Sequence, residues 1–241
     1  MTASAGSLDA RLERWSRVHA CLMLAGAIAA AVLRRPWPIG VVAVTSFAWL
    51  IALGSGAWTA SGRFGIANVV TVVRLATLVA CALGSYTARG ELIAALMLGV
   101  FALDAIDGWL ARRTGSVSAF GAHFDMETDA FLVLTIDLLL WQRGTLGAWI
   151  MTSGLLRYVY VLFLAALPGD AAPMPKSRWA RAAFGMLVVG LVLALALENA
   201  LGAFAALLGT ALVTASFARS FHWSWLKAKQ AQPQQGNAPG R

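Results

Sequence analysis

The sequence has few charged residues and few cysteines. Charged side chains make up 12% of its 241 residues, about half of the roughly 25% that is usual in soluble domains. The two cysteines, Cys21 and Cys81, lie in separate apolar stretches, so neither a disulfide framework nor a thiolate metal site is indicated. The composition therefore excludes a soluble domain and a small disulfide-stabilised domain.

Apolar residues fill the chain instead. They make up 59% of the sequence, and the mean hydropathy is +0.72. A membrane-spanning helix needs about 17–25 mostly apolar residues, and most of the apolar stretches have this length. They lie at 16–33, 39–54, 66–84, 90–111, 119–141, 145–167, 182–200 and 202–221. The pattern predicts an all-α fold, a polytopic membrane helical bundle.

The polar stretches divide the chain into four parts. A polar N-terminal segment, 1–15, precedes a hairpin of two additional transmembrane helices in 16–60. A six-helix core follows in 61–222, and a polar tail in 223–241 is too polar to bury and is expected to be disordered. We expect no chemistry in the two polar terminal segments.

The net charge of +8 does not indicate a nucleic-acid partner. Most basic residues lie in short loops and tails between apolar stretches, as the positive-inside rule requires when the N-terminus is cytoplasmic. Four basic residues, Arg34, Arg35, Arg89 and Arg143, then lie on the opposite side, and the pair Arg34 and Arg35 disagrees locally with this topology. Arg74 and Arg157 remain inside apolar stretches.

Four of the eleven acidic residues lie close together in the sequence. Asp104 and Asp107 are three positions apart at the end of one apolar stretch, and Asp125 and Asp129 are four apart at the start of the next, so each pair shares one helical face. A short polar connection joins the two stretches, as expected between antiparallel helices. The four carboxylates should therefore converge at one depth.

Clustered carboxylates in a partly desolvated site need compensating positive charge. Divalent cations fit best, and ligands that are all oxygen favour Mg²⁺, Mn²⁺ or Ca²⁺ over zinc. His123 is close in sequence, but a lone imidazole is more often a hydrogen-bonded helix residue than a ligand.

Small residues beside the aspartates leave space for a ligand. Gly108 and Ala111 follow Asp107 in the helix expected at 90–111, and they allow a base or a phosphate to approach the backbone. Arg112 can contact a diphosphate, because its guanidinium suits paired phosphate oxygens. Gly121, one turn before Asp125, gives the facing helix the same clearance.

These residues form one pattern of fixed spacing. It reads Asp104-x2-Asp107-Gly108-x2-Ala111-Arg112-x8-Gly121-x3-Asp125-x3-Asp129. In every fixed position it matches the signature of the CDP-alcohol phosphotransferase (CDP-alcohol phosphatidyltransferase) family, which this chain resembles. The helix pattern from 65 to 221 is also similar to the core of that family, with the first two helices as an addition.

The resemblance implies a six-helix core, a homodimer, a cavity open to the cytoplasm and two bound divalent cations. By analogy the four aspartates ligate the metals, Gly108 and Arg112 hold the CDP moiety, and Asp129 is also the general base. The protein is then expected in the bacterial inner (cytoplasmic) membrane, among membrane lipids, with its active site on the cytoplasmic side.

A second polar element lies in the first helix of the core. Asn68-x2-Thr71-x2-Arg74 is similar to an element of the phosphatidylglycerophosphate synthases, and it adds Asn68 and Thr71 to the residues expected to bind CDP. Polar helical residues at this spacing could equally form interhelical hydrogen bonds.

The function that the resemblance implies is transfer of a phosphatidyl group from CDP-diacylglycerol to an alcohol acceptor, with release of CMP. One alternative is transfer of a phospho-alcohol from a soluble CDP-alcohol to diacylglycerol. A divalent-cation transporter is a remote alternative, because it leaves Gly108, Ala111, Arg112 and Gly121 unexplained. The acceptor itself is not specified by the motif.

Further charged residues have weaker assignments. Glu127 departs from the usual small or apolar residue at its position and points away from Asp125 and Asp129, so we expect it to face another helix. Asp137 and Arg157 lie deep enough to need partners, and either they pair with each other or Arg157 contacts the substrate.

Three basic residues follow the longest polar interruption of the apolar pattern. They are Lys176, Arg178 and Arg181. They are either positive-inside residues near anionic lipid headgroups or, together with Arg157, ligands for the phosphate of a charged acceptor.

Overall fold

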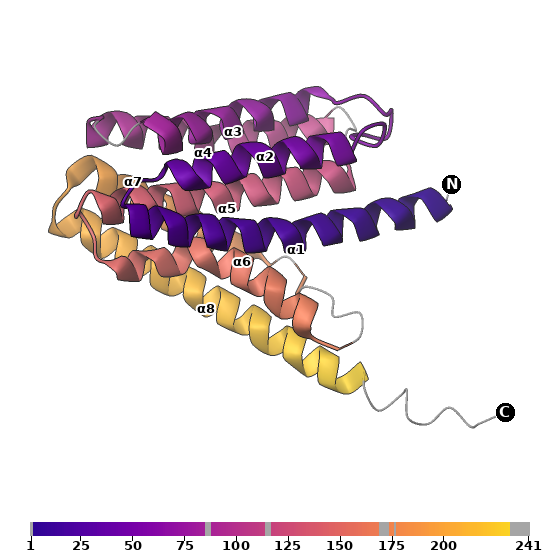
Figure 1. The fold of residues 1–241 in the computed structure, drawn as a ribbon. Helices are drawn as coiled ribbons and strands as arrows, with labels where there is room; N and C mark the ends of the chain where they lie inside the picture. The colour runs from indigo at the N-terminus through magenta and orange to yellow at the C-terminus, as the bar shows by residue number, and fades with distance from the viewer. Residues whose placement is uncertain (1, 85–87, 114–116, 169–173, 176, 232–241) are drawn as a thin grey trace.

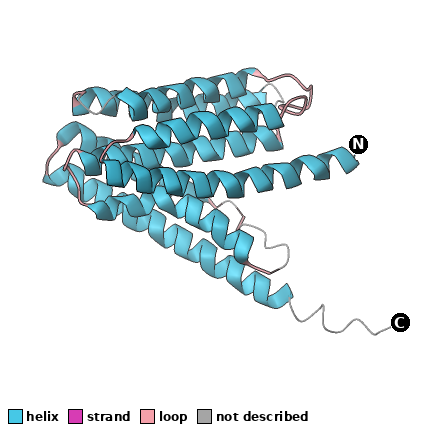
Figure 2. Ribbon diagram, in the orientation of Figure 1, coloured by secondary structure: helices cyan, strands magenta, loops and turns pink. Residues whose placement is uncertain are grey.

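The computed structural model describes residues 2–84, 88–113, 117–168, 174–175 and 177–231. The side chains of residues 2–7, 105, 107, 111 and 231 lie outside this description. The described ranges form helices and loops without strands, and the helices pack into one elongated bundle (Figures 1 and 2). The helices are α1 (Thr2–Leu33), α2 (Trp37–Leu53), α3 (Ile66–Gly84), α4 (Gly90–Arg113), α5 (Ala119–Gln142), α6 (Met151–Ala166), α7 (Arg178–Leu197) and α8 (Ala200–Ala231), with a 3₁₀ turn at Ala148–Ile150.

The helices have the composition of a membrane bundle. Among the described residues, six helices are long and apolar enough to cross a membrane. They are α1, α3, α4, α7, α8 and the segment Ala148–Ala166 that contains α6. Their outward faces carry exposed apolar side chains such as Ile66, Val73 and Phe204, as a surface in contact with lipid would. The prediction of an all-α polytopic bundle is confirmed.

Helix α5 is the central element of the bundle. It packs against α1, α2, α3, α4, α6 and α7, and every residue from Ala130 to Leu140 is buried. A helical segment that is apolar on nearly all sides, as this one is, belongs in a core. The same helix carries acidic residues along its length, and these must find partners on its neighbours. The rotation of α5 therefore decides where its carboxylates point.

The N-terminal hairpin packs directly onto the core. Its first helix, α1, begins at Thr2, so residues 2–15 continue the helix where the sequence predicts only a polar segment. Leu12 and Trp15 are fully buried, and the Trp15 indole N–H donates to the Ser46 carbonyl of α2 at 3.0 Å. Helix α1 then lies against α5 and α6. Because two large apolar side chains face inward, this polar stretch is amphipathic and not merely solvated.

Helix α8 also extends further than the sequence predicts. It continues to Ala231, through the first residues of the stretch 223–241 that the composition assigns to a tail. Ser224 is fully buried and its hydroxyl lies 2.9 Å from the Tyr160 hydroxyl of α6. Ala228 is also buried. Side chains on one face of this extension pack on the bundle, which keeps it helical, while residues 232–241 lie outside the described part.

Helices α7 and α8 approach each other through glycines. A Cβ atom at Gly190 would meet the backbone carbonyl oxygen of Ala205, with the Ala205 carbonyl carbon at 2.7 Å. A Cβ at Gly209 would lie 2.6 Å from the Leu187 Cα. Small residues at such positions let helix backbones pack closely in membranes.

We predict that Gly190→Ala destabilises the folded protein by about 1–3 kcal/mol, the usual cost of forcing extra volume into a packed interface. The matched control is Gly99→Ala in α4, where an added Cβ would meet nothing within 4 Å. Unfolding midpoints measured in one detergent should fall for the first variant and not for the second. A Gly190→Ala protein as stable as the wild type would show that the backbones can separate at no cost.

Candidate metal and substrate site

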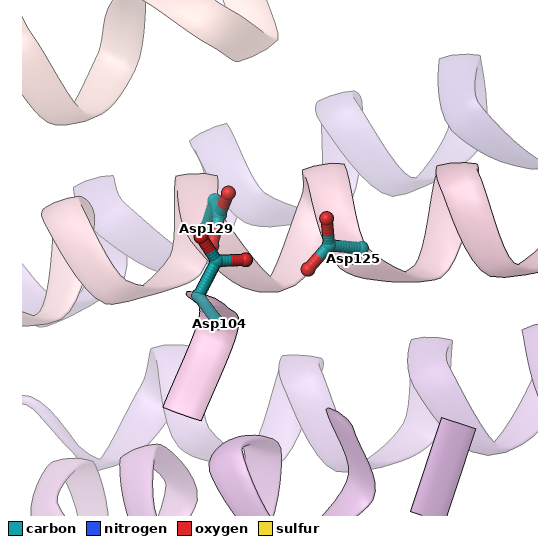
Figure 3. A group of neighbouring side chains, drawn as sticks. All are labelled: Asp104, Asp125 and Asp129. Atoms are coloured by element: carbon teal, nitrogen blue, oxygen red, sulfur yellow. The ribbon is translucent and has the colours of Figure 1, made fainter. Parts of the chain in front are cut away.

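Three aspartates from two helices converge on one side of α5. Asp104 comes from the second half of α4, and Asp125 and Asp129 lie one turn apart on α5 (Figure 3). One carboxylate oxygen from each residue lies within 4.8 Å of the others. The convergence predicted for these three residues is thus observed. The side chain of the fourth predicted ligand, Asp107, lies outside the described residues.

The start of α5 is fixed by a cap that sets its register. The Ser118 hydroxyl accepts a hydrogen bond from the Gly121 backbone N–H at 3.0 Å and so satisfies one of the first free N–H groups of the helix. The same hydroxyl donates to the Trp58 carbonyl at 2.6 Å, which ties the helix to the loop before α3. The positions of Asp125 and Asp129 follow from this anchored end.

Arg74 of α3 is the cation at the centre of the cluster. Its side chain is fully buried, and one terminal nitrogen lies 2.7 Å from Asp125 and 3.2 Å from Asp104. The other terminal nitrogen lies 2.5 Å from Asp129, and Nε donates to the Val100 carbonyl of α4 at 3.2 Å. One guanidinium therefore joins α3, α4 and α5, and it satisfies its donors while partly neutralising three carboxylates.

The sequence placed Arg74 in a polar element and inside an apolar stretch, but it did not indicate its pairing with the aspartates. The position of Arg74 inside an apolar stretch could have indicated this pairing, because an arginine within a membrane span requires an acidic partner. The three-residue spacing of Asn68, Thr71 and Arg74 places all three on one face of α3.

The cluster has the donor chemistry of a divalent-cation site. All three described ligand groups are carboxylates, and their side chains are 21–40% exposed, so the cluster is accessible and is not sealed in the core. One guanidinium against three carboxylates leaves a net negative charge even without Asp107. Oxygen donors and residual negative charge together suit a hard divalent ion. These residues could hold such an ion.

The residues predicted to bind CDP lie beside the cluster. A Cβ at Gly108 would lie 3.3 Å from an Arg112 terminal nitrogen, so Arg112 folds back along α4 over the space that the missing side chain leaves. A Cβ at Gly121 would lie 3.2 Å from the Asn68 amide oxygen, so the glycine allows α3 and α5 to approach. The side chain of Ala111 lies outside the described residues.

Asn68 and Thr71 bond to backbone carbonyls in this structure. The Asn68 amide donates to the carbonyls of Phe64 and Trp58, and the Thr71 hydroxyl donates to Ala67 at 3.2 Å. Asn68 therefore fastens the loop before α3 to the helix that carries Arg74.

A cavity of about 970 Å³ opens beside the cluster. Residues from α1, α5, α6, α7 and α8 line it, and among the cluster residues Asp129 borders it. His123 also lines the cavity, although its Nδ1 lies 3.0 Å from the Ala119 carbonyl of its own helix. Asp129 thus belongs to the cluster and also borders the cavity.

Arg157 lines the cavity and pairs with Glu127. Its guanidinium lies 2.5 Å from the Glu127 carboxylate, which is 1% exposed. The prediction that Glu127 faces another helix is confirmed, and the alternative that Arg157 pairs with Asp137 is wrong. Asp137 instead accepts hydrogen bonds from the Ser153 hydroxyl at 2.8 Å and the Gly154 N–H at 2.7 Å. Asp137 lies almost three turns further along α5 than Glu127, so the two carboxylates meet different parts of α6.

Two of the other predicted acceptor-binding residues are not among those that line the cavity. Arg178 and Arg181 are exposed on α7 and are absent from the described lining of the cavity. Lys176 lies outside the described residues. Four residues of α1 that line the cavity, Asp9, Glu13, Ser16 and Arg17, were not predicted, because the sequence assigned no chemistry to the polar segment 1–15 or to the first apolar stretch.

Comparison with known proteins agrees with the motif. The family model of the CDP-alcohol phosphatidyltransferases matches residues 64–216. Over 38 residues the chain is 53% identical to CDP-diacylglycerol–inositol 3-phosphatidyltransferase 1 of Arabidopsis thaliana, a match that spans 16% of this chain and 17% of that relative. No solved structure matches the chain.

The family match runs from just before α3 into α8 and includes Arg74 and the three converging aspartates. It covers more than half of the chain and leaves out α1 and α2. The chain belongs to the CDP-alcohol phosphatidyltransferase family.

Proposed function

We propose that this protein transfers the phosphatidyl group of CDP-diacylglycerol to an alcohol acceptor and releases CMP, in a reaction that depends on Mg²⁺ or Mn²⁺. The observation that carries the proposal is the convergence of Asp104, Asp125 and Asp129 within 4.8 Å beside a cavity. The relative from Arabidopsis thaliana is named for CDP-diacylglycerol, which favours this donor over a soluble CDP-alcohol.

The cluster would hold two divalent cations through Asp104, Asp107, Asp125 and Asp129. When bound, the cations neutralise the diphosphate of the donor and stabilise the departing phosphate. Gly108, Ala111 and Gly121 would leave room for the CDP moiety. Arg112 would contact its diphosphate, with Asn68 and Thr71 on the facing helix.

Asp129 would act as the general base. It borders both the cluster and the cavity, so an acceptor hydroxyl in the cavity can reach its carboxylate. The acceptor oxygen forms a bond to the phosphorus that carries the diacylglycerol, and its proton passes to Asp129. The bond from that phosphorus to the bridging oxygen breaks, and CMP leaves with the electron pair. Arg74 would hold Asp129 and Asp125 in place during this exchange.

The end of the bundle that carries the site would face the cytoplasm. The N-terminal end of α1, the C-terminal end of α6 and the C-terminal end of α8 lie at one end of the bundle (Figure 1). Basic residues such as Arg112 and Arg178 lie at this end, as the positive-inside rule requires for the bacterial inner membrane. A homodimer, as in the family, is part of the proposal.

Asp129→Asn should abolish turnover, because an amide can neither accept the proton nor supply its charge to the cations. We expect at least about a hundredfold loss, the lower range for a positioned acid or base. The assay is CMP release from CDP-diacylglycerol with a panel of alcohols. Glu198→Gln, which alters a carboxylate paired with Arg143 in the connection between α7 and α8, should retain activity. Unchanged turnover in Asp129→Asn would refute the general-base assignment.

Removal of divalent ions with EDTA should abolish CMP release, and Mg²⁺ or Mn²⁺ should restore it. Oxygen-only ligands bind Mg²⁺ and Mn²⁺ well, so zinc should restore activity poorly. Activity that persists after exhaustive chelation would contradict the assignment of the cluster.

Arg74→Ala should lower the unfolding midpoint of the metal-free protein, because three carboxylates lose their cation. Loss of one partner from a buried ion pair costs about 3–5 kcal/mol. Added Mg²⁺ should raise the midpoint of Arg74→Ala by more than that of the wild type, because the ion replaces the missing charge. The matched control is Arg143→Ala, which breaks the ion pair with Glu198 and should respond to Mg²⁺ as the wild type does. Equal Mg²⁺ shifts in all three proteins would contradict a shared site for Arg74 and the ion.

A further inference from the structure

The first helix forms part of the cavity wall although it lies outside the family match. The match begins at residue 64, whereas Asp9, Glu13, Ser16 and Arg17 of α1 line the same cavity as Asp129. Asp9, Glu13 and Arg17 recur every four residues and therefore share one face of the helix. This face adds charged side chains to a cavity whose other lining residues come mainly from α5, α6, α7 and α8.

Another face of α1, formed by Leu12, Trp15 and His19, packs against the rest of the bundle and holds the charged face in position. Leu12, Trp15 and His19 are buried, and the Trp15 and His19 rings stack at 4.6 Å. His19 Nδ1 lies 2.8 Å from the Ser46 hydroxyl of α2, and its ring lies edge-on to Tyr158 of α6 at 5.9 Å. Contacts to two other helices thus fix the rotation of α1, and the charged face is directed to the cavity.

Arginines from three helices line this cavity. Arg17 comes from α1, Arg157 from α6 and Arg219 from α8. Arg157 is held by the buried Glu127, and Arg17 lies 3.4 Å from Glu13 with its side chain 54% exposed. A weak, exposed ion pair of this kind contributes little to stability. Arg17 can therefore leave Glu13 for a better anionic partner at small cost.

We propose that α1 is the acceptor-selective wall of the active site, and that Arg17, with Arg157 and Arg219, binds the phosphate of a phosphorylated alcohol. This inference rests on the proposed phosphatidyl transfer. Guanidinium groups match phosphate oxygens in charge and geometry. Glu13 competes with the phosphate for Arg17 and repels it, so the pair tunes the affinity for the acceptor.

The test is a kinetic comparison of Arg17→Ala, Glu13→Gln and the control Arg14→Ala in a neutral detergent. Arg14 lies on the same helix, is exposed and is absent from the described lining of the cavity. The acceptors are glycerol 3-phosphate and inositol 1-phosphate, each with its unphosphorylated form. Rates are measured against acceptor concentration and, separately, against CDP-diacylglycerol concentration.

Arg17→Ala should raise the KM for the phosphorylated acceptor about tenfold, the effect of losing one charge-assisted hydrogen bond at a half-exposed site. Glu13→Gln should lower that KM, because the competing charge is removed. Both variants should retain the wild-type KM for CDP-diacylglycerol, which also shows that they fold. Arg14→Ala should behave as the wild type in both series.

Several results would overturn the inference while leaving the proposed function intact. One is a KM in Arg17→Ala equal to that of Arg14→Ala. Another is a rise, in both Arg17→Ala and Glu13→Gln, of the KM for an unphosphorylated acceptor. That result would show that this face of α1 binds a neutral polyol. A third is an effect of Arg17→Ala that appears only when anionic lipid is added to the detergent, which would assign Arg17 to lipid headgroups. A wild-type protein that transfers to no alcohol would instead contradict the proposed function itself.

Discussion

The rest of the structure depends on the balance of charge around one buried guanidinium. Arg74 is fully buried, and it can remain charged there only because Asp104, Asp125 and Asp129 surround it. The carboxylates in turn can lie together only because a cation separates them. This mutual requirement fixes α3, α4 and α5 relative to one another, and it places Asp129 at the edge of the cavity. A divalent ion can enter such a cluster because the guanidinium leaves part of the negative charge uncompensated.

Helix α5 uses its acidic residues to meet different neighbours. Asp125 and Asp129 face Arg74 of α3, Glu127 faces Arg157 of α6, and Asp137 accepts hydrogen bonds from Ser153 and Gly154 in the first turn of α6. Each contact is specific in direction, whereas the apolar packing around α5 would tolerate rotation. The polar contacts therefore define the orientation of a helix whose second half is buried on all sides, and they direct one set of carboxylates to the proposed metal site and another to contacts with α6.

Helical periodicity predicted what lies on one face of one helix. It placed Asp125 and Asp129 together, turned Glu127 away from them, and brought Asp104 to the same depth through the short connection. It could not give the rotation or depth of a neighbouring helix. Asp137 was therefore considered as a partner of Arg157, and Glu127 was not. The central position of Arg74 was missed for the same reason. The inward face of α1 was missed because Leu12 and Trp15 are separated by charged residues that lower the local hydropathy, although their spacing of three positions is helical.

The contacts of α1 also constrain how the protein assembles in the membrane. The first hairpin is made before the core, and its own contacts, such as Trp15 with Ser46, can form at once. The contacts of α1 with α6 join segments more than a hundred positions apart, so they must wait until the sixth helix has been inserted. The wall of the cavity is therefore synthesised first and docked late. The complete lining of the cavity exists only after α8, the last helix that contributes to it, has been inserted.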